Sequence, residues 1–233
     1  MKYFELDWKL GNDPHIPGMD GSYVKEKDKF FKTGEMGPNK FYNHDYEFDY
    51  LVPKAFGDPE PEAEIITDYH MWHGRSPRGG TTNVISARFK EVLEQFSLSS
   101  SKFYPAKVLF KDKFYPYYVW QVLQDDYKPF IDFDLTEFNN LSNSRVQKNK
   151  TFEVKQFSSF EELHSYRKEY WNRKWNFERL VLKSSFKVLD FCMFPIFYFV
   201  VSERLKNAIE EAGLIGIVFN ELPVPIEFSD EVI

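Results

Sequence analysis

Residues 195–221 read PIFYFVVSERLKNAIEEAGLIGIVFNE, and this stretch decides the fold. Residues 196–201 are apolar, aromatic and β-branched, which is typical of a buried strand. Ser202 follows at the position of a helix N-cap, where its hydroxyl can accept a hydrogen bond from a free backbone N–H. Apolar residues then recur at helical spacing until Gly213, which can adopt the left-handed conformation that ends a helix. Because 215–219 is again strand-like, the stretch predicts a strand, a capped helix and a second strand.

A similar stretch lies upstream, at a constant offset of 116 positions (200 − 84). The segment 84–96, VISARFKEVLEQF, aligns with 200–212, VVSERLKNAIEEA, and five of the thirteen positions are identical. A strand-like segment follows each helix, at 106–110 and at 215–219. Two amphipathic helices after a serine cap can resemble each other by chance. The alternative is a fold that uses the same strand–Ser–helix–strand unit twice.

The composition indicates a globular α+β protein. The chain has 233 residues, of which 19% are Phe, Tyr or Trp, and this ring area is enough for a sizeable core. We expect one α+β domain over 1–233, with mixed, mostly antiparallel sheet and a few helices. Within it, 1–80 is predicted to be irregular and β-rich, and 81–233 to form the α+β core.

Periodicity and turn residues predict the remaining elements. Residues 2–10 alternate as an edge strand would, and 115–123 is predicted to form a hairpin with the strand before it. Residues 130–135 alternate apolar and acidic side chains, which predicts a short strand. A capping-box pattern begins at Ser159, and a helix is expected from there to about Arg179.

The sequence shows no signal for export or membrane insertion. The N-terminus MKYFELDWKL lacks an apolar core of signal-peptide length, and the longest apolar run, near 191–201, is too short to span a bilayer. Cys192 is the only cysteine, so no internal disulfide can form, which suits a reducing compartment. We therefore expect a cytoplasmic protein with no membrane partner.

One group of carboxylates could carry chemistry. It consists of Asp125, Asp126, Asp132 and Asp134. If Asp132 and Asp134 share one strand face, they could hold Mg²⁺ or act as an acid–base pair, together with His70 or His73. The more common explanation is a solvated strand face preceded by turn aspartates. We therefore predict no enzyme activity, no metal and no cofactor, and keep a metal-dependent enzyme as an alternative.

The segment 158–180 suggests a second alternative. It interleaves basic residues with aromatic rings around Trp171 and Trp175, and such a helix would suit RNA or single-stranded DNA. The simpler interpretation is an amphipathic helix that buries its rings and leaves Arg and Lys in solvent. Because the flanking parts of the chain are acidic, nucleic acid is not the partner we expect.

A family resemblance lies in the two strand–Ser–helix–strand stretches. The residues that carry it are FPI at 194–196, VVSERLK at 200–206, GLIGIVF at 213–219, FYPA at 103–106, YYVW at 117–120 and FIDFD at 130–134. Over about 84–135 and 190–222 the chain resembles bacterial polymorphic-toxin immunity proteins, in particular the groups called immunity protein 43 and immunity protein 11. The resemblance implies a cytosolic non-enzyme that binds a cognate toxin, often the C-terminal domain of a secreted effector, and blocks its active site.

The resemblance transfers no binding residues, so the toxin-facing surface is predicted from charge. The net charge is −6, and acidic faces would steer a basic toxin towards the protein. Two acidic clusters are candidates. The first comprises Asp125, Asp126, Asp132 and Asp134, and the second comprises Asp58, Glu60, Glu62 and Glu64.

Overall fold

The chain folds into two compact units of mixed α and β structure. In the computed structural model, the described residues are 1–8, 17–20, 41, 51–55, 65–71, 82–142, 154–169, 173–194 and 198–231. Unit 1 comprises Met1–Tyr3, Tyr127–Val188 and Glu221–Ile233, and unit 2 comprises Phe4–Asp126 and Leu189–Asn220. The sheets are mostly antiparallel, which confirms the predicted fold class.

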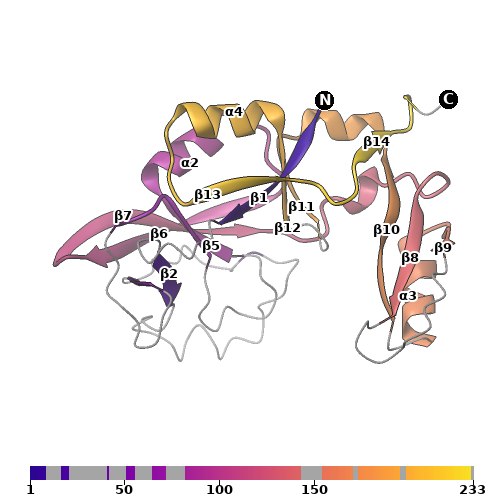
Figure 1. Cartoon of the computed structure of the whole chain (residues 1–233), viewed down its shortest axis with the longest axis horizontal. Helices are drawn as coiled ribbons and strands as arrows, with labels where there is room; N and C mark the ends of the chain where they lie inside the picture. Colours follow the sequence, from indigo (N-terminus) through magenta and orange to yellow (C-terminus); the bar gives the residue numbers. More distant parts are fainter. Residues whose placement is uncertain are drawn as a thin grey trace. The chain divides into compact units, whose positions relative to one another are not determined.

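The first sheet of unit 2 has the strand order β4–β5–β7–β6, and Figure 1 labels its strands β5, β6 and β7. Its strands are β4 (Tyr69–Met71), β5 (Thr82–Ser86), β6 (Ser101–Phe110) and β7 (Lys113–Val122). All neighbours pair antiparallel, and helix α2 (Ala87–Leu93) follows β5. The predicted hairpin is confirmed, with longer strands than the sequence pattern indicated. A small sheet of β2 (Pro17–Asp20) and β3 (Val52–Ala55) also belongs to unit 2.

The second sheet of unit 2 has the order β11–β12–β1–β13. Its strands are β11 (Phe191–Phe194), β12 (Tyr198–Ser202), β1 (Tyr3–Trp8) and β13 (Ile217–Glu221), and helix α4 (Glu203–Glu211) follows β12. The prediction that the N-terminal segment is an edge strand was wrong, because β1 has a neighbour on each side. Both neighbours lie about 200 positions away in the sequence, so local alternation could not reveal them.

Corresponding elements occupy corresponding places in the two sheets. β4, β5, α2 and β6 match β11, β12, α4 and β13, and the inner position is taken by β7 in one sheet and by β1 in the other. The strand–Ser–helix–strand unit is therefore present twice. The inner strand differs in origin, because β7 returns from β6 through a hairpin whereas β1 comes from the N-terminus.

One aromatic core joins the two sheets of unit 2. Trp120 of β7 is fully buried, and its ring centroid lies 4.5 Å from that of Phe191 and 5.6 Å from that of Phe199. Phe89 of α2 and Leu205 of α4 pack into the same cluster. The two halves of the repeat therefore share a single core, which burial of these rings stabilises.

Unit 1 contains the sheet β14–β10–β8–β9. Its elements are β8 (Glu137–Ser142), β9 (Val154–Lys155), α3 (Phe160–Glu169), β10 (Arg173–Leu182) and β14 (Ile226–Phe228), with 3₁₀ turns η1 (Lys128–Phe130) and η2 (Ser184–Val188). β14 runs parallel to β10 and the other pairs are antiparallel. In the described part of the chain, no helix combines the length and apolar character needed to cross a bilayer.

Two predictions in unit 1 were wrong. The helix expected from Ser159 to Arg179 ends at Glu169, and β10 begins at Arg173. The serine half of the capping box is present, since the Glu162 N–H donates to Ser159 Oγ at 3.2 Å, whereas the Glu162 carboxylate accepts from the Ser158 N–H at 2.6 Å. Beyond it, pairing with β8 overrides helical periodicity, because Phe177 lies opposite Phe138 with ring centroids 5.2 Å apart.

Residues 130–135 do not form the predicted strand. η1 ends at Phe130, Ile131 makes one isolated bridge to Leu182, and a turn follows. The turn is closed by the Thr136 N–H, which donates to the Asp132 carbonyl at 2.9 Å. The Thr136 hydroxyl also donates to Val181 O and accepts from Val181 N–H, at 3.0 and 3.1 Å. The Thr136 side chain therefore bonds the N–H and C=O groups of Val181, which the backbone of a longer strand would have bonded instead.

Candidate protein-binding site

The predicted acidic residues fall in different places. Asp125 and Asp126 follow β7 in unit 2, whereas Asp132 and Asp134 lie in the turn of unit 1. The Asp126 carboxylate accepts a hydrogen bond from the Ser100 N–H, so it fastens the segment before β6. Asp134 is exposed, and Asp132 is half-buried. The second cluster, Asp58, Glu60, Glu62 and Glu64, lies outside the described residues.

Of the two histidines suggested for metal binding, His70 lies in the described part of the chain, where it contacts Thr67 and Tyr117. His70 is buried on β4, with a ring nitrogen 3.1 Å from Thr67 Oγ1 and its ring centroid 5.9 Å from that of Tyr117. His73 and Trp171 lie outside the described residues. Within the described ranges, no three His, Cys, Asp or Glu side chains gather as metal ligands would. Burial raises the pKa of the Cys192 thiol to about 12, so this group stays protonated at neutral pH.

A buried carboxylate organises the start of α4. The Leu205 N–H donates to Ser202 Oγ at 3.1 Å, and the Ser202 hydroxyl donates to Asp190 Oδ1 at 2.7 Å. Arg204 Nε donates to the same oxygen at 2.9 Å. The Ser97 N–H donates to Asp190 Oδ2 at 3.0 Å. The predicted N-cap is thus confirmed, and a carboxylate that sequence reasoning missed stands behind it.

The same arrangement recurs at the start of α2. The Phe89 N–H donates to Ser86 Oγ at 3.1 Å, and the Ser86 hydroxyl donates to Asp68 Oδ1 at 2.6 Å. The Ile215 N–H donates to Asp68 Oδ2 at 2.9 Å. Arg88 lies farther from the carboxylate than Arg204 does in the other network, with Nη1 3.9 Å from Asp68 Oδ2.

The two networks are reciprocal. Asp190 lies before β11 and β12 but holds Ser97 in the loop after α2, whereas Asp68 lies before β4 and β5 but holds Ile215 in the loop after α4. The arginines follow the same rule. Arg88 Nη2 donates to Ala212 O at 2.7 Å, and Arg204 Cζ lies 5.8 Å from the centroid of the Phe96 ring. Each half of the repeat therefore fastens the other.

The electrostatic setting of Asp190 is dominated by these donors. Burial by itself would raise the pKa of this carboxyl, since only 1% of the side chain is exposed. The hydrogen bonds from Arg204, Ser202 and the Ser97 N–H outweigh burial and hold the pKa of Asp190 below its usual value. Asp190 is therefore ionised at neutral pH and serves to hold the fold.

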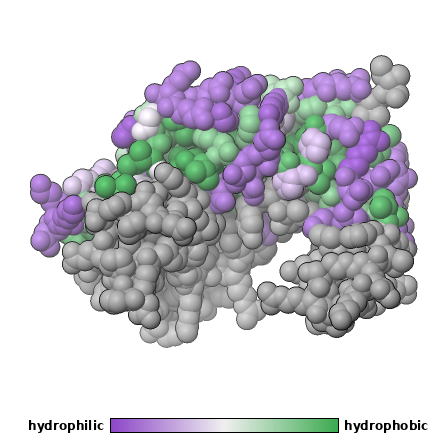
Figure 2. Space-filling view, in the orientation of Figure 1, coloured by the Kyte–Doolittle hydropathy of each residue, from purple (hydrophilic) through white to green (hydrophobic). Residues whose placement is uncertain are grey.

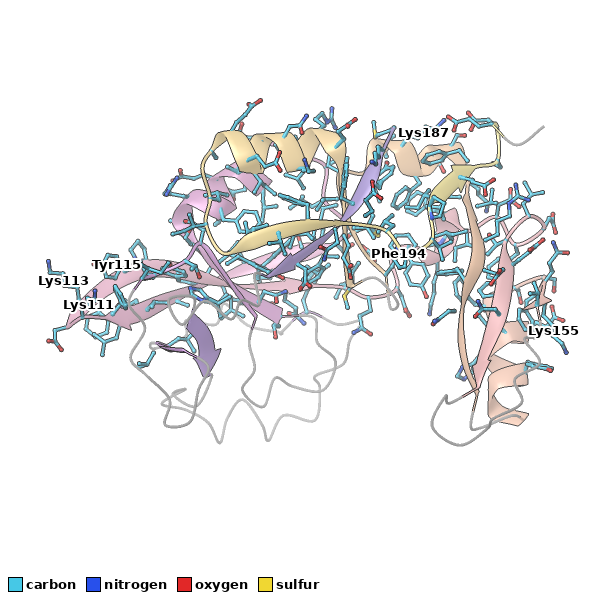
Figure 3. All side chains as sticks on the ribbon, viewed as in Figure 1. Lys111, Lys113, Tyr115, Lys155, Lys187 and Phe194 are labelled. Atoms are coloured by element: carbon cyan, nitrogen blue, oxygen red, sulfur yellow. The ribbon has the colours of Figure 1, made fainter. Side chains whose placement is uncertain are left out.

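A different surface is formed by residues 107–116, the outer end of the β6–β7 hairpin (the hairpin end). β5 pairs with β7 only over residues 117–121. The β6–β7 pairing continues outward from Lys107–Pro116 to Phe110–Lys113. The hairpin end therefore extends past β5 as a two-stranded ribbon, which Figure 3 shows with Lys111, Lys113 and Tyr115 labelled.

The turn of the hairpin end is exposed and tightly bent. Residues 111–114 are all exposed, and Phe114 keeps 59% of its surface in solvent. Lys111 and Asp112 both have positive φ, 47° and 59°, as a two-residue hairpin turn of the primed type requires. Figure 2 shows hydrophilic surface at this tip, with apolar surface between the tip and α2.

The base of the hairpin end is anchored on one face by the packing of Val108 and along the edge of β6 by a parallel bridge to Leu51. Val108 is fully buried and packs in a cluster with Leu51 and Tyr117. The Leu51 N–H donates to Lys107 O at 2.8 Å, and the Leu109 N–H donates to Leu51 O at 2.9 Å. The ribbon is thus fastened close to its exposed tip. No family model and no curated protein matches the sequence.

Proposed function

We propose that this protein binds a cognate protein toxin, such as the C-terminal domain of a secreted effector, and neutralises it by occluding its active site. The observation that carries the proposal is that four buried polar residues of unit 2 form hydrogen bonds that hold the fold together. Ser86, Ser202, Asp68 and Asp190 are all engaged in the two reciprocal cap networks. They stabilise a scaffold that presents a rigid surface.

A rigid scaffold favours binding over catalysis for a physical reason. A catalytic constellation needs polar groups that converge on a space where a substrate can sit. A protein inhibitor needs a surface that loses little conformational entropy when it meets its partner. The doubled core and the anchored hairpin end meet the second requirement. The segments that resemble immunity proteins, about 84–135 and 190–222, contain the elements of this same scaffold.

The electrostatic part of the proposal concerns the first acidic cluster. The net charge of −6 and the exposed Asp134 would speed encounter with a basic toxin. We expect Asp134→Lys to slow association several-fold at low salt and to change dissociation little. Glu178→Lys, an acidic-to-basic change on β10, is the matched control. Equal association rates for the wild type and Asp134→Lys would remove steering by this residue.

The experiment that tests the function has two stages. The tagged chain is used to capture partners in its own host, and the main stoichiometric partner is identified by mass spectrometry. That partner is then expressed alone and together with this chain in a sensitive strain. We expect growth arrest in the first case and restored growth in the second, and no rescue by Leu205→Asp, which places a charge at a fully buried position of α4. A partner that is harmless by itself, or whose toxicity this chain leaves unchanged, would refute the proposal.

A further inference from the structure

We propose that the hairpin end is the part of this protein that enters its partner, and that it fits an apolar pocket rimmed by carboxylates. The identity of that partner as a toxin rests on the proposed function. The surface itself is argued from four residues that share one face of the ribbon. They are Lys107 and Leu109 on β6, and Pro116 and Phe114 on β7.

The register places these residues together. Leu109 lies directly opposite Phe114, and Lys107 lies opposite Pro116. Side chains of directly opposed residues stand on the same face of a sheet. Lys107, Phe114 and Pro116 are exposed and Leu109 is half-buried, whereas Val108, between Lys107 and Leu109, turns into the core of the other face. The face is therefore an apolar pair followed by a lysine and a proline.

Phe114 has the properties of an interface anchor. It is a large ring with 59% of its surface in solvent, so the folded unit does not depend on it for its core. It stands two positions after the two-residue turn, on a ribbon that Leu51 fastens by two backbone hydrogen bonds. An aromatic side chain held in this way gains burial on binding and loses little backbone freedom.

The charges of the hairpin end indicate which kind of pocket would accept the Phe114 ring. Lys107 shares the face of Phe114, Lys111 lies in the turn with its Nζ 5.0 Å from the Phe110 ring centroid, and Lys113 stands on the opposite face. Counted by sequence, residues 107–116 hold these three lysines and one acid, Asp112, a formal charge of +2 (3 − 1) on a chain whose net charge is −6. A pocket with carboxylates at its rim would complement these lysines and accept the ring. Active sites that use acid–base catalysis or divalent cations concentrate carboxylates in this way. The hairpin end therefore fits the active site of a hydrolytic or metal-dependent enzyme.

The same charges favour a protein over a nucleic acid or an anionic membrane. Those partners are negative along their whole surface, so they would meet the repulsion of the entire acidic chain. A protein can place a few carboxylates at one pocket and be neutral or basic elsewhere. Pro116 also has no N–H to donate, which disfavours addition of a partner strand at that position. We therefore expect the side chains of the hairpin end, and not its backbone, to recognise the partner.

The first test is photocrosslinking of the full chain in its own host. A photoactivatable phenylalanine replaces Phe114 in one variant and Val188 in the control, because Val188 is an equally exposed apolar residue (64%) of unit 1. We expect a protein adduct from position 114 that is absent from position 188, with the crosslinked peptide rich in Asp and Glu. The proposal is overturned by an RNA or lipid adduct, by no adduct, or by the same adduct from both positions.

The second test measures affinity for the crosslinked protein. We expect Phe114→Ala to weaken binding about tenfold or more, as an anchor residue should. The double variant Lys111→Glu with Lys113→Glu should also weaken it about tenfold, mostly through slower association. The matched controls are Val188→Ala and Lys183→Glu, an exposed lysine of unit 1, which should stay within about twofold of the wild type. Equal losses in variants and controls, or no loss, would overturn the assignment.

The outcomes of these experiments distinguish a failure of the proposed binding surface from a failure of the proposed immunity function. A partner that crosslinks at position 114 but is not toxic keeps the hairpin end as the binding surface and refutes the immunity role. A toxin that this chain neutralises without crosslinking at position 114, and with full affinity for Phe114→Ala, keeps the immunity role and refutes the surface.

Discussion

The carboxylate of Asp190 accepts a hydrogen bond from the Ser202 hydroxyl at 2.7 Å, although the residues lie on either side of a β-hairpin. Ser202 uses its other capacity to accept the Leu205 N–H. One buried carboxylate thereby orients the cap of α4, while its second oxygen holds the loop after α2. Asp68 and Ser86 repeat this relationship at 2.6 Å. Because the two pairs are alike, a substitution in one network can be compared directly with the same substitution in the other.

We expect Asp190→Asn to lower the free energy of unfolding by about 2 kcal/mol, because the charge-assisted hydrogen bonds from Arg204 and Ser202 weaken at a fully buried position. Asp68→Asn is the matched control. Its arginine partner is 3.9 Å away rather than 2.9 Å, so it should cost less. Urea unfolding monitored by tryptophan fluorescence measures both. A larger loss for Asp68→Asn would contradict the stronger role given to Arg204.

Acid should remove the contribution of Asp190. Its pKa is lowered in the folded protein because donors outweigh burial, so its stabilisation is fully present above the unfolded value of about 4 and is lost as the pH falls through the folded pKa. The melting temperatures of the wild type and Asp190→Asn should therefore differ at pH 7 and converge as the pH falls through the lowered folded pKa of Asp190. A constant gap across this range would show that Asn disturbs packing rather than charge.

The loop after α4 contains two glycines that should respond differently to alanine. Gly216 has φ +88°, and a Cβ there would lie 2.6 Å from Thr67 Cβ. Gly213 has φ +62° with open space around it. We expect Gly213→Ala to cost about 1 kcal/mol from backbone conformation alone. Gly216→Ala should cost roughly 2 kcal/mol or more, since Thr67 must also move. Thermal unfolding of the two variants compares them, and equal costs would mean that Thr67 yields freely.

Local chemistry explains what the sequence could predict. Ser202, Gly213 and the apolar spacing between them act within a few residues, so cap, helix and strand were visible. The place of β1 depends on pairing with residues near 200 and 217, and the ending of the helix at Glu169 depends on the ring of Phe138. Asp68 and Asp190 escaped notice because they precede their serines by 18 and 12 residues, a difference that no constant offset can align. The hairpin was predicted, but the exposure of the Phe114 ring depends on where the neighbouring strand β5 ends, at Ser86, which the sequence pattern does not give.

The sequence also predicts a single domain over 1–233, and this prediction can be checked by unfolding. The boundary between the two units falls inside β1, between Tyr3 and Phe4, and at the last residue of β13. Because these strands run through the boundary, we expect both units to unfold in one cooperative transition. Leu180→Ala in β10 and Leu205→Ala in α4 each remove a fully buried side chain and should cost about 2–5 kcal/mol. In a single domain, each variant shifts the whole transition, whether it is followed by calorimetry or by hydrogen exchange in either unit. Two separate calorimetric peaks, with Leu180→Ala moving only one of them, would instead assign the units to independent domains.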